Sequence, residues 1–271
     1  MTAIQPHHPA GAFKQSDASA AAGLPKRDLF GVGVTAAGPD AVIDQVMDWA
    51  HERRGATVDF MPVHGLIVAH GDPEHRERMN GFDVVACDGQ PIRWALNRFH
   101  DAGLDERVYG PDTMLKVCRR CAAEGVGVYL YGGRPEVLED LCHRLVDRLP
   151  ELKIVGAESP PFRPLTEEED AKAVRRINAS GAGVVFLGIG CPRQEAFAAA
   201  HRDRLRAVQL CVGAAFDFHA GAVRQAPAWM QRRGLEWLYR LTREPGRLWR
   251  RYLVTNTTFV ALFARRAVLG R

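Results

Sequence analysis

The sequence predicts an α/β protein with a Rossmann-like, mostly parallel sheet flanked by helices, followed by a helical C-terminal appendage. Short continuous apolar runs alternate with longer amphipathic segments from Leu29 onward, a pattern typical of parallel strands that helices cover on both faces. The strand pattern stops after residue 225, and helical periodicity follows it. Glycine and aspartate cluster directly after several apolar runs, and ligands of α/β sheets bind beyond such strand ends.

Seven apolar runs are predicted to be strands, in the order LFGVGV, TVDFM, DVVA, VGVYLY, LKIVG, GVVFLG and VQLCVG. The amphipathic segments between them predict helices near residues 39–53, 64–79, 111–124, 135–148, 167–179 and 192–205. Beyond the sheet, Pro227 and Pro245 are expected to open helices of the appendage, because proline is tolerated in the first helical turn.

Composition divides the chain into three parts. Residues 1–27 are rich in Ala, Gly, Pro, Ser and Gln, and we expect a disordered leader there. Residues 28–223 are the predicted α/β catalytic core. Residues 224–271 are the predicted appendage, which holds eleven arginines and two acidic residues in a chain whose net charge is only +4.

Three of the five tryptophans also lie in the appendage. Arginine together with tryptophan suits an anionic surface above an apolar layer, as at a membrane interface. A helical hairpin with buried tryptophans and solvated arginines fits the same pattern. A nucleic-acid partner is a third interpretation, which the acidic remainder of the chain and the absence of a reader motif disfavour.

The composition excludes several classes of protein. With 46% hydrophobic and 25% charged residues, the chain is neither disordered throughout nor collagen-like. It has no apolar stretch of eighteen residues and no recognisable secretory signal, so we expect a cytoplasmic protein whose six cysteines are reduced.

Motifs for cofactors and metals are also missing. Gly188-x-Gly190 lacks the third glycine of the dinucleotide fingerprint, which disfavours a nicotinamide enzyme. Cys118 and Cys121 lie in mid-helix without a second pair, and no histidine spacing matches a metal site. A Gly-x-Ser-x-Gly elbow is absent, so a serine hydrolase is unsupported. We expect neither a metal nor a cofactor.

Two strand ends carry candidate functional residues. Asp88 follows the run DVVA and is interpreted either as a general base or as the cap of a helix starting near Pro91. Gly132 and Gly133 precede a helix, where their N–H groups could contact a phosphate or serve only the geometry of the turn.

The appendage carries a candidate anion site. Arg240, Arg247 and Arg250 would share one face of a continuous helix, although Pro245 interrupts it. Guanidinium groups are planar forks of donors with a permanent charge, so three of them could clamp a diphosphate.

Seven strings of residues, in this order along the chain, resemble one known family. They are Asp88-Gly89, Arg107-Val108-x-Gly110-x-Asp112, Tyr131-Gly132-Gly133-x-Pro135, Gly188-x-Gly190-x-Pro192-Arg193-Gln194-Glu195, Gly213-x-x-Phe216-Asp217-Phe218-x-Ala220-Gly221, Arg224-x-Ala226-Pro227-x-Trp229 and Gly234-Leu235-Glu236-Trp237-Leu238-Tyr239-Arg240-Leu241-x-x-Glu244-Pro245-x-Arg247. The family is that of the bacterial WecG/TagA/CpsF glycosyltransferases, glycosyltransferase family 26. The resemblance extends from about Leu29 to Tyr252.

The resemblance implies an inverting, metal-independent glycosyltransferase without a cofactor. Such an enzyme moves a sugar from a UDP-sugar to a polyprenyl-diphosphate-linked saccharide, for cell-surface polymers or exopolysaccharide. It would work as a peripheral protein on the inner face of the cytoplasmic membrane. Its partners would be the donor, the lipid-linked acceptor and the membrane surface, with no nucleic acid.

The resemblance also implies roles for individual residues. Asp88 inherits the role of base, and the arginines carried over onto Arg240, Arg247 and Arg250 complete the site when the appendage docks. The residues expected to bind substrate are His64, Arg107, Gly132, Gly133, Gln194 and Asp217.

One segment departs from the family pattern. A Thr-x-Asn-like sequence is usual after the second strand, whereas this chain has Phe60-Met61-Pro62-Val63-His64. His64 is the candidate substitute for those polar contacts. The sugar, the acceptor, the linkage and a homo-oligomeric state stay open, as do two alternatives to the enzyme: a non-catalytic binding module of the same fold and a basic nucleic-acid-binding protein.

Overall fold

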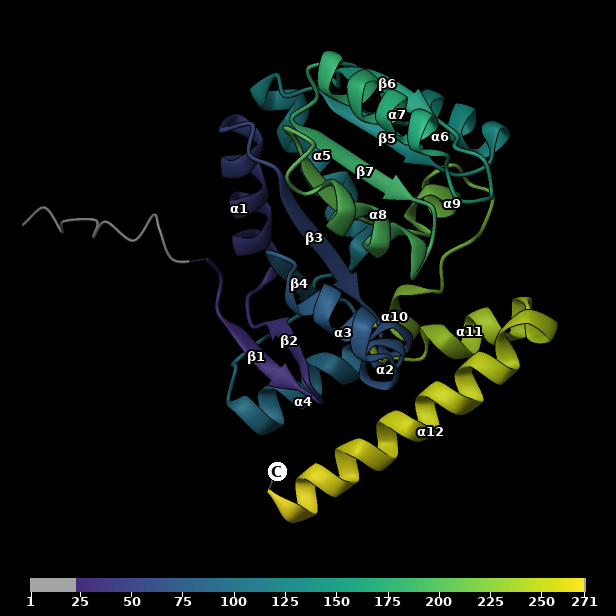
Figure 1. Ribbon diagram of the computed structural model, residues 1–271. Coiled ribbons are helices and arrows are strands. Elements are labelled where there is room, and N and C mark those ends of the chain that lie inside the picture. Colours follow the sequence, from purple (N-terminus) through teal and green to yellow (C-terminus); the bar gives the residue numbers. More distant parts are fainter. Residues whose placement is uncertain (1–22, 271) are drawn as a thin grey trace, which may run out of the picture.

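The computed structural model describes residues 23–270, which form one layered α/β unit with a helical C-terminal segment (Figure 1). Most of the leader expected at residues 1–27 lies outside the described residues. Lys26 and Arg27, the last two residues of that expected leader, belong instead to the first strand of the sheet.

The described strands form one eight-stranded sheet in the order β1-β2-β4-β3-β8-β7-β5-β6. Their bounds are β1 Lys26–Leu29, β2 Val32–Thr35, β3 Ala56–Met61, β4 Val84–Cys87, β5 Val128–Gly132, β6 Ile154–Glu158, β7 Val184–Gly188 and β8 Val208–Cys211. All neighbours pair in parallel except β1 and β2. Every residue of β3, β4, β5 and β8 is buried, which accounts for the continuous apolar runs.

Helices cover the sheet and continue beyond it (Figure 1). Their bounds are α1 Pro39–His51, α2 Val63–Gly71, α3 Pro73–Asn80, α4 Gln90–His100, α5 Gly110–Glu124, α6 Pro135–Arg148, α7 Glu167–Ala179, α8 Arg193–His201, α9 Ala215–His219, α10 Ala228–Arg232, α11 Glu236–Arg243 and α12 Pro245–Leu269. On one side α1, α5, α9 and α6 pack in succession, and α2, α3 and α8 form a second contacting group.

Two predicted elements are divided in the structure. The run LFGVGV is not one strand but the antiparallel hairpin β1–β2, because Phe30 and Gly31 both have positive φ, as a two-residue type I′ turn requires. The helix expected at residues 64–79 is two helices. Asp72 is extended and caps α3 by accepting from the backbone N–H groups of Glu74 and His75.

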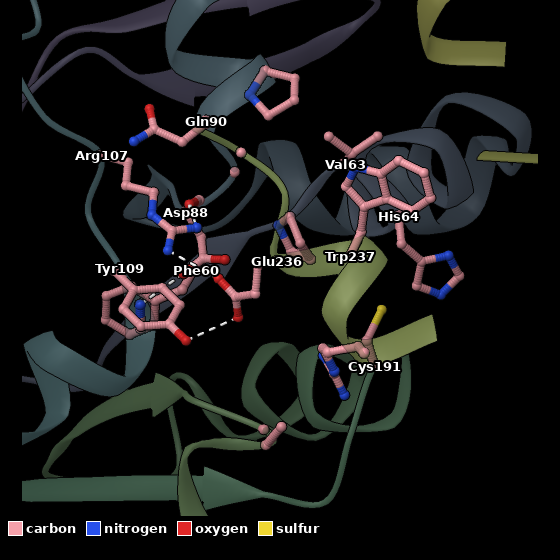
Figure 2. A pocket seen from close by; sticks show the side chains of 18 of the residues that line it. Phe60, Val63, His64, Asp88, Gln90, Arg107, Tyr109, Cys191, Glu236 and Trp237 are labelled. Atoms are coloured by element: carbon pink, nitrogen blue, oxygen red, sulfur yellow. Dashed lines mark hydrogen bonds and ion pairs between the residues drawn. The ribbon is translucent and has the colours of Figure 1, made fainter. Parts of the chain in front are cut away.

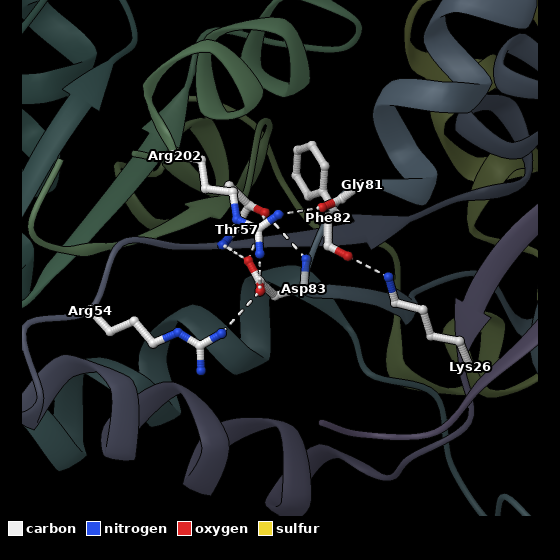
Figure 3. A network of polar contacts seen from close by, with 7 residues as sticks. All are labelled: Lys26, Arg54, Thr57, Gly81, Phe82, Asp83 and Arg202. Carbon is white, nitrogen blue, oxygen red and sulfur yellow. Dashed lines mark hydrogen bonds and ion pairs between the residues drawn. The ribbon is translucent and has the colours of Figure 1, made fainter. Parts of the chain in front are cut away.

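The amino ends of the strands carry a structural ion-pair network (Figure 3). The buried carboxylate of Asp83 accepts from the backbone N–H of Thr57 at 2.9 Å, from Arg202 at 2.7 Å and from Arg54 at 3.5 Å. The network joins β3 to the segments before β4 and after α8. It lies at the end of the sheet opposite to the one where ligands bind, so we assign it to stability.

The C-terminal segment, residues 224–270, is here called the appendage. Its longest helix, α12, packs against α2 and α11. Phe259 contacts Phe30 edge-on with ring centroids 5.9 Å apart, and Phe263 contacts Phe99 at 4.8 Å. Figure 1 shows α11 and α12 beyond the carboxyl end of β3. Within the described residues, no helix combines the length and the apolar character that crossing a bilayer requires.

Candidate active site

A cavity of about 810 Å³ lies at the carboxyl ends of β3, β4 and β8. The core supplies its floor, including Asp88 after β4 and Gly213 after β8, and the appendage closes it with residues of α11 and α12. Of the residues expected to act on substrate, six line this cavity: His64, Asp88, Arg107, Gln194, Arg240 and Arg247. Both parts of the chain therefore contribute to one site.

Asp88 does not cap the helix that follows it. The cap residue of α4 is Gly89, without a side-chain bond, and Asp88 Oδ1 accepts instead from the backbone N–H of Gly110 at 2.7 Å. Gly110 is the first residue of α5, so the carboxylate lies at the positive end of that helix. The capping interpretation is wrong for α4, and the carboxylate faces the cavity.

The electrostatic surroundings make Asp88 suitable as a base. Burial raises its pKa from 3.8 to about 6, and the negative charge of Glu236 acts in the same direction. The positive charges of Arg107 and Arg240 and the Gly110 N–H oppose this rise. A carboxyl group with a pKa close to neutral is a stronger base than an ordinary aspartate and is still ionised at pH 7.

Arg107 lies beside Asp88 in a cluster that joins the core to the appendage (Figure 2). Its Nη1 donates to the backbone oxygen of Asp88 at 3.1 Å, and its Nη2 contacts Glu236 Oε2 at 2.9 Å. The guanidinium stacks 4.0 Å from the ring centroid of Tyr109, whose hydroxyl donates to Glu236 Oε1 at 2.9 Å. Glu236 and Tyr109 were not among the predicted site residues; an acidic residue in a block of arginines is the signal that could have indicated Glu236.

Of the three arginines predicted to bind a diphosphate, two line the cavity and the third, Arg250, does not. Arg240 and Arg247 line the cavity, and the buried Nε of Arg240 has no hydrogen-bond partner among the described residues. Arg250 is exposed and does not line it; its guanidinium lies 5.4 Å from the ring of Trp249. A helix turns about 100° per residue, so Arg250 lies on the opposite side of α12 from Tyr252, which faces the cavity. Arg251 lines the cavity in its place.

The Gly132–Gly133 turn lies outside the cavity lining. The N–H of Gly133 donates to the carbonyl of Gly188 at 3.1 Å. A Cβ on Gly132 would stand 2.5 Å from the backbone carbon of Gly188, so this glycine permits the close approach of β5 and β7. The structure thus gives Gly132 the turn-geometry role that was the alternative to a phosphate contact, and the phosphate contact of Gly132 and Gly133 stays a prediction. The cavity instead contacts Gly190 and Gly213.

Three more predicted residues have defined surroundings. Gln194 donates from Nε2 to Glu195 at 3.0 Å and accepts the Gly190 N–H at 3.2 Å, so its amide orientation is fixed. His64 stands at the start of α2; burial and the charge of Arg251 lower its pKa to about 4, and its buried Nδ1 has no partner among the described residues. Asp217 is partly buried outside the lining.

The charges around Asp217 link it to the same site. Burial raises the pKa of Asp217, and the nearby guanidinium groups of Arg134, Arg247 and Arg240 act against that rise. Asp217 therefore contributes to the field behind the cavity wall without lining the cavity. Among the described residues, no group of three His, Cys, Asp or Glu side chains is arranged to hold a metal ion.

A mostly parallel α/β sheet with three carboxylates and four guanidinium groups lining a cavity at its ligand-binding edge is typical of Rossmann-like group-transfer enzymes. Comparison with protein-family models then identifies the family. Residues 27–271 match the model described as the Glycosyl transferase WecG/TagA/CpsF family, so the chain belongs to that family of glycosyltransferases. The resemblance drawn from the sequence motifs is confirmed.

Proposed function

We propose that the protein transfers a sugar, with inversion, from a UDP-sugar to a polyprenyl-diphosphate-linked saccharide at the cytoplasmic face of the membrane. One observation carries the proposal: the carboxylate of Asp88 and the guanidinium groups of Arg240 and Arg247 line the same cavity. The base and the stabilisers of a diphosphate leaving group are thus close enough to act on one donor molecule.

The reaction follows from this arrangement. The acceptor hydroxyl attacks the anomeric carbon and loses its proton to Asp88, while the bond from that carbon to the UDP oxygen breaks. General-base assistance of this kind contributes about 10²–10⁴-fold in rate. Negative charge grows on the departing diphosphate, and Arg240, Arg247 and Arg251 stabilise it, typically by a few kcal/mol for each well-placed donor.

The apolar part of the cavity lining suits a lipid-linked acceptor. It includes Trp94, Phe259, Val260 and Phe263, and the last three lie about two or more helical turns beyond Arg251 on α12. His64, whose low pKa keeps it neutral at pH 7, lines the cavity near Arg251, and its buried Nδ1 has no partner among the described residues. We propose that His64 takes over substrate contacts that the Thr-x-Asn segment makes in other family members.

The outer side of α12 supports attachment to the membrane surface. Trp249, Leu253 and Val254 are 49%, 57% and 60% exposed, and Arg250 lies among them. An amphipathic helix with tryptophan, aliphatic residues and arginine binds in the plane of an anionic interface. We therefore propose that Arg250 contacts lipid headgroups rather than the diphosphate.

The proposal is tested with a panel of UDP-sugars and a lipid-diphosphate acceptor, with Asp88→Asn as the inactive control. UDP, and neither NAD nor an oligonucleotide, is expected to raise the thermal midpoint, because only a ligand of the folded state does so. Transfer at the wild-type rate by Asp88→Asn, or stabilisation by an oligonucleotide alone, would contradict the proposal.

Membrane attachment is tested separately by sedimentation with anionic and neutral vesicles. Leu253→Gln combined with Val254→Gln is expected to lower binding to anionic vesicles at least tenfold. Phe162→Gln is the control, since it removes an apolar side chain that is even more exposed, at 75%, and that belongs to the core rather than to the appendage. Equal binding of wild type and the double variant would refute the assignment of this surface.

A further inference from the structure

One acidic side chain of the appendage, that of Glu236, contacts residues of the core. The appendage contains two acidic residues, Glu236 and Glu244. Glu244 pairs with Arg247 inside the appendage at 2.7 Å, whereas Glu236 crosses to the core and contacts both Arg107 and Tyr109. The side chains of Arg107 and Glu236 are only 10% and 16% exposed, so this ion pair is largely removed from solvent.

A buried guanidinium must have an anionic partner, because an unpaired buried charge is strongly destabilising. Arg107 already touches the backbone oxygen of Asp88, and besides Glu236 the carboxylate whose charge acts on Arg107 is that of Asp88, so Asp88 is the alternative partner. A carboxylate bound by a guanidinium fork is held in its charged form and accepts a proton poorly. In the structure the carboxylate of Glu236 forms the ion pair with the guanidinium of Arg107. Asp88 Oδ1 instead accepts a hydrogen bond from the neutral backbone N–H of Gly110.

We propose that Glu236 is a positioning residue for the transfer reaction: by binding Arg107 it keeps that guanidinium from the carboxylate of Asp88 and leaves the carboxylate free to accept the acceptor's proton. The inference rests on the proposed role of Asp88 as base. It gives the docked appendage a second task beside its arginines, since the residue that frees the base arrives on α11. Figure 2 shows Arg107 and Glu236 beside Asp88.

The groups facing Asp88 agree with this assignment. Burial raises its pKa most, the charge of Glu236 on α11 raises it further, and Arg107, the Gly110 N–H and Arg240 lower it. From β3, Asp59 lies close enough to be affected by the charge of Asp88. Replacing Glu236 by a neutral residue removes one raising influence and frees Arg107 to act more strongly in the opposite direction, so the pKa of Asp88 must fall.

Glu236→Gln tests the proposal, because the amide keeps the size of the side chain and an acceptor for the Tyr109 hydroxyl. We expect kcat to fall about 10–100-fold, with a smaller change in the KM of the donor, and the acid limb of the pH–rate profile to move to lower pH. Glu244→Gln is the matched control: it removes the other acidic side chain of the appendage, which does not contact Arg107, and should leave the acid limb in place.

A second measurement does not depend on turnover. The Asp88 carboxyl is titrated by ¹³C NMR, with Asp88→Asn to assign its signal, in wild type and in Glu236→Gln. A wild-type midpoint near 6 that moves lower in the variant supports the positioning role even if UDP-sugars are not the donors. An unchanged midpoint in the variant, a wild-type midpoint near 4, or a loss of kcat without a shift of the acid limb overturns it.

Discussion

Asparagine in place of Asp88 is expected to abolish sugar transfer and, at pH 8, to stabilise the fold. Burial in the cavity wall raises the pKa of the carboxyl from 3.8 to about 6. Between these two values the folded protein holds a proton that the unfolded chain has lost. Ionising the group therefore weakens the folded state as the pH rises through about 6, and a neutral amide avoids this penalty.

The size of the gain follows from the same values. One pKa step corresponds to about 1.36 kcal/mol, so the rise from 3.8 to about 6 amounts to a penalty of at most about 3 kcal/mol. It is nearly absent at pH 4 and complete at pH 8. The amide keeps a carbonyl acceptor for the Gly110 N–H, which Asp88 now binds at 2.7 Å. For a chain of this size the gain corresponds to roughly 6–12 °C in thermal midpoint.

Urea unfolding at pH 4, 6 and 8 measures the difference between Asp88→Asn and wild type. Asp83→Asn serves as the contrasting variant, because Asp83 is equally charged but paired with two arginines at the other end of the sheet (Figure 3). It should lose about 2–4 kcal/mol at pH 8. The reasoning is refuted if Asp88→Asn is no more stable than wild type at pH 8, or if its gain is as large at pH 4.

Two further predictions concern the cavity wall. Arg240→Ala is expected to lower kcat about 100-fold. The kcat of Arg250→Ala, measured in detergent, should stay within about threefold of wild type, and this variant should lose affinity for anionic vesicles. Equal losses of kcat in the two variants would contradict the helical phase of α12. Burial and the charge of Glu195 raise the pKa of Asp59 well above its usual range. Wild-type stability should therefore fall as the pH rises through that pKa, and Glu195→Gln should be the more stable form in urea at pH 9; a variant less stable there would exclude this repulsion.

Much of the fold could be predicted from the sequence, because its strands are buried on both faces and its helices carry local signals. The bounds expected for α6 and α7 match those observed. A proline in the first turn begins α6, and a capping box of Thr166 and Glu169 begins α7. The prediction of a single strand for LFGVGV was wrong because the sequence does not show that Phe30 has positive φ. Gly31 is the one residue of this turn whose type indicates a turn.

The sequence motifs predicted site residues correctly where the side chain of a motif residue faces the cavity. They did not do so where the motif residue is needed for the conformation of the backbone. Gly133 belongs to a family motif, yet its N–H is taken by the Gly188 carbonyl, and the sequence does not distinguish a glycine that binds phosphate from one that lets strands approach. Arg250 was misplaced because the break at Pro245 leaves the phase of α12 undetermined. Glu236 was missed because its partners, Arg107 and Tyr109, are more than a hundred residues away in the chain.

The pairing of charges around the cavity explains why the site needs both parts of the chain. Four guanidinium groups line it. Arg107 is neutralised by Glu236 and Arg247 by Glu244, whereas Arg240 and Arg251 have no carboxylate partner among residues 23–270. Both of these belong to the appendage. The core by itself contributes Arg107, which without Glu236 would lie beside Asp88 with no carboxylate of the appendage to pair with it. A donor bound before the appendage docks would therefore meet the proposed base beside Arg107, and it would lack Arg240 and Arg251, the two cations proposed to stabilise its leaving group.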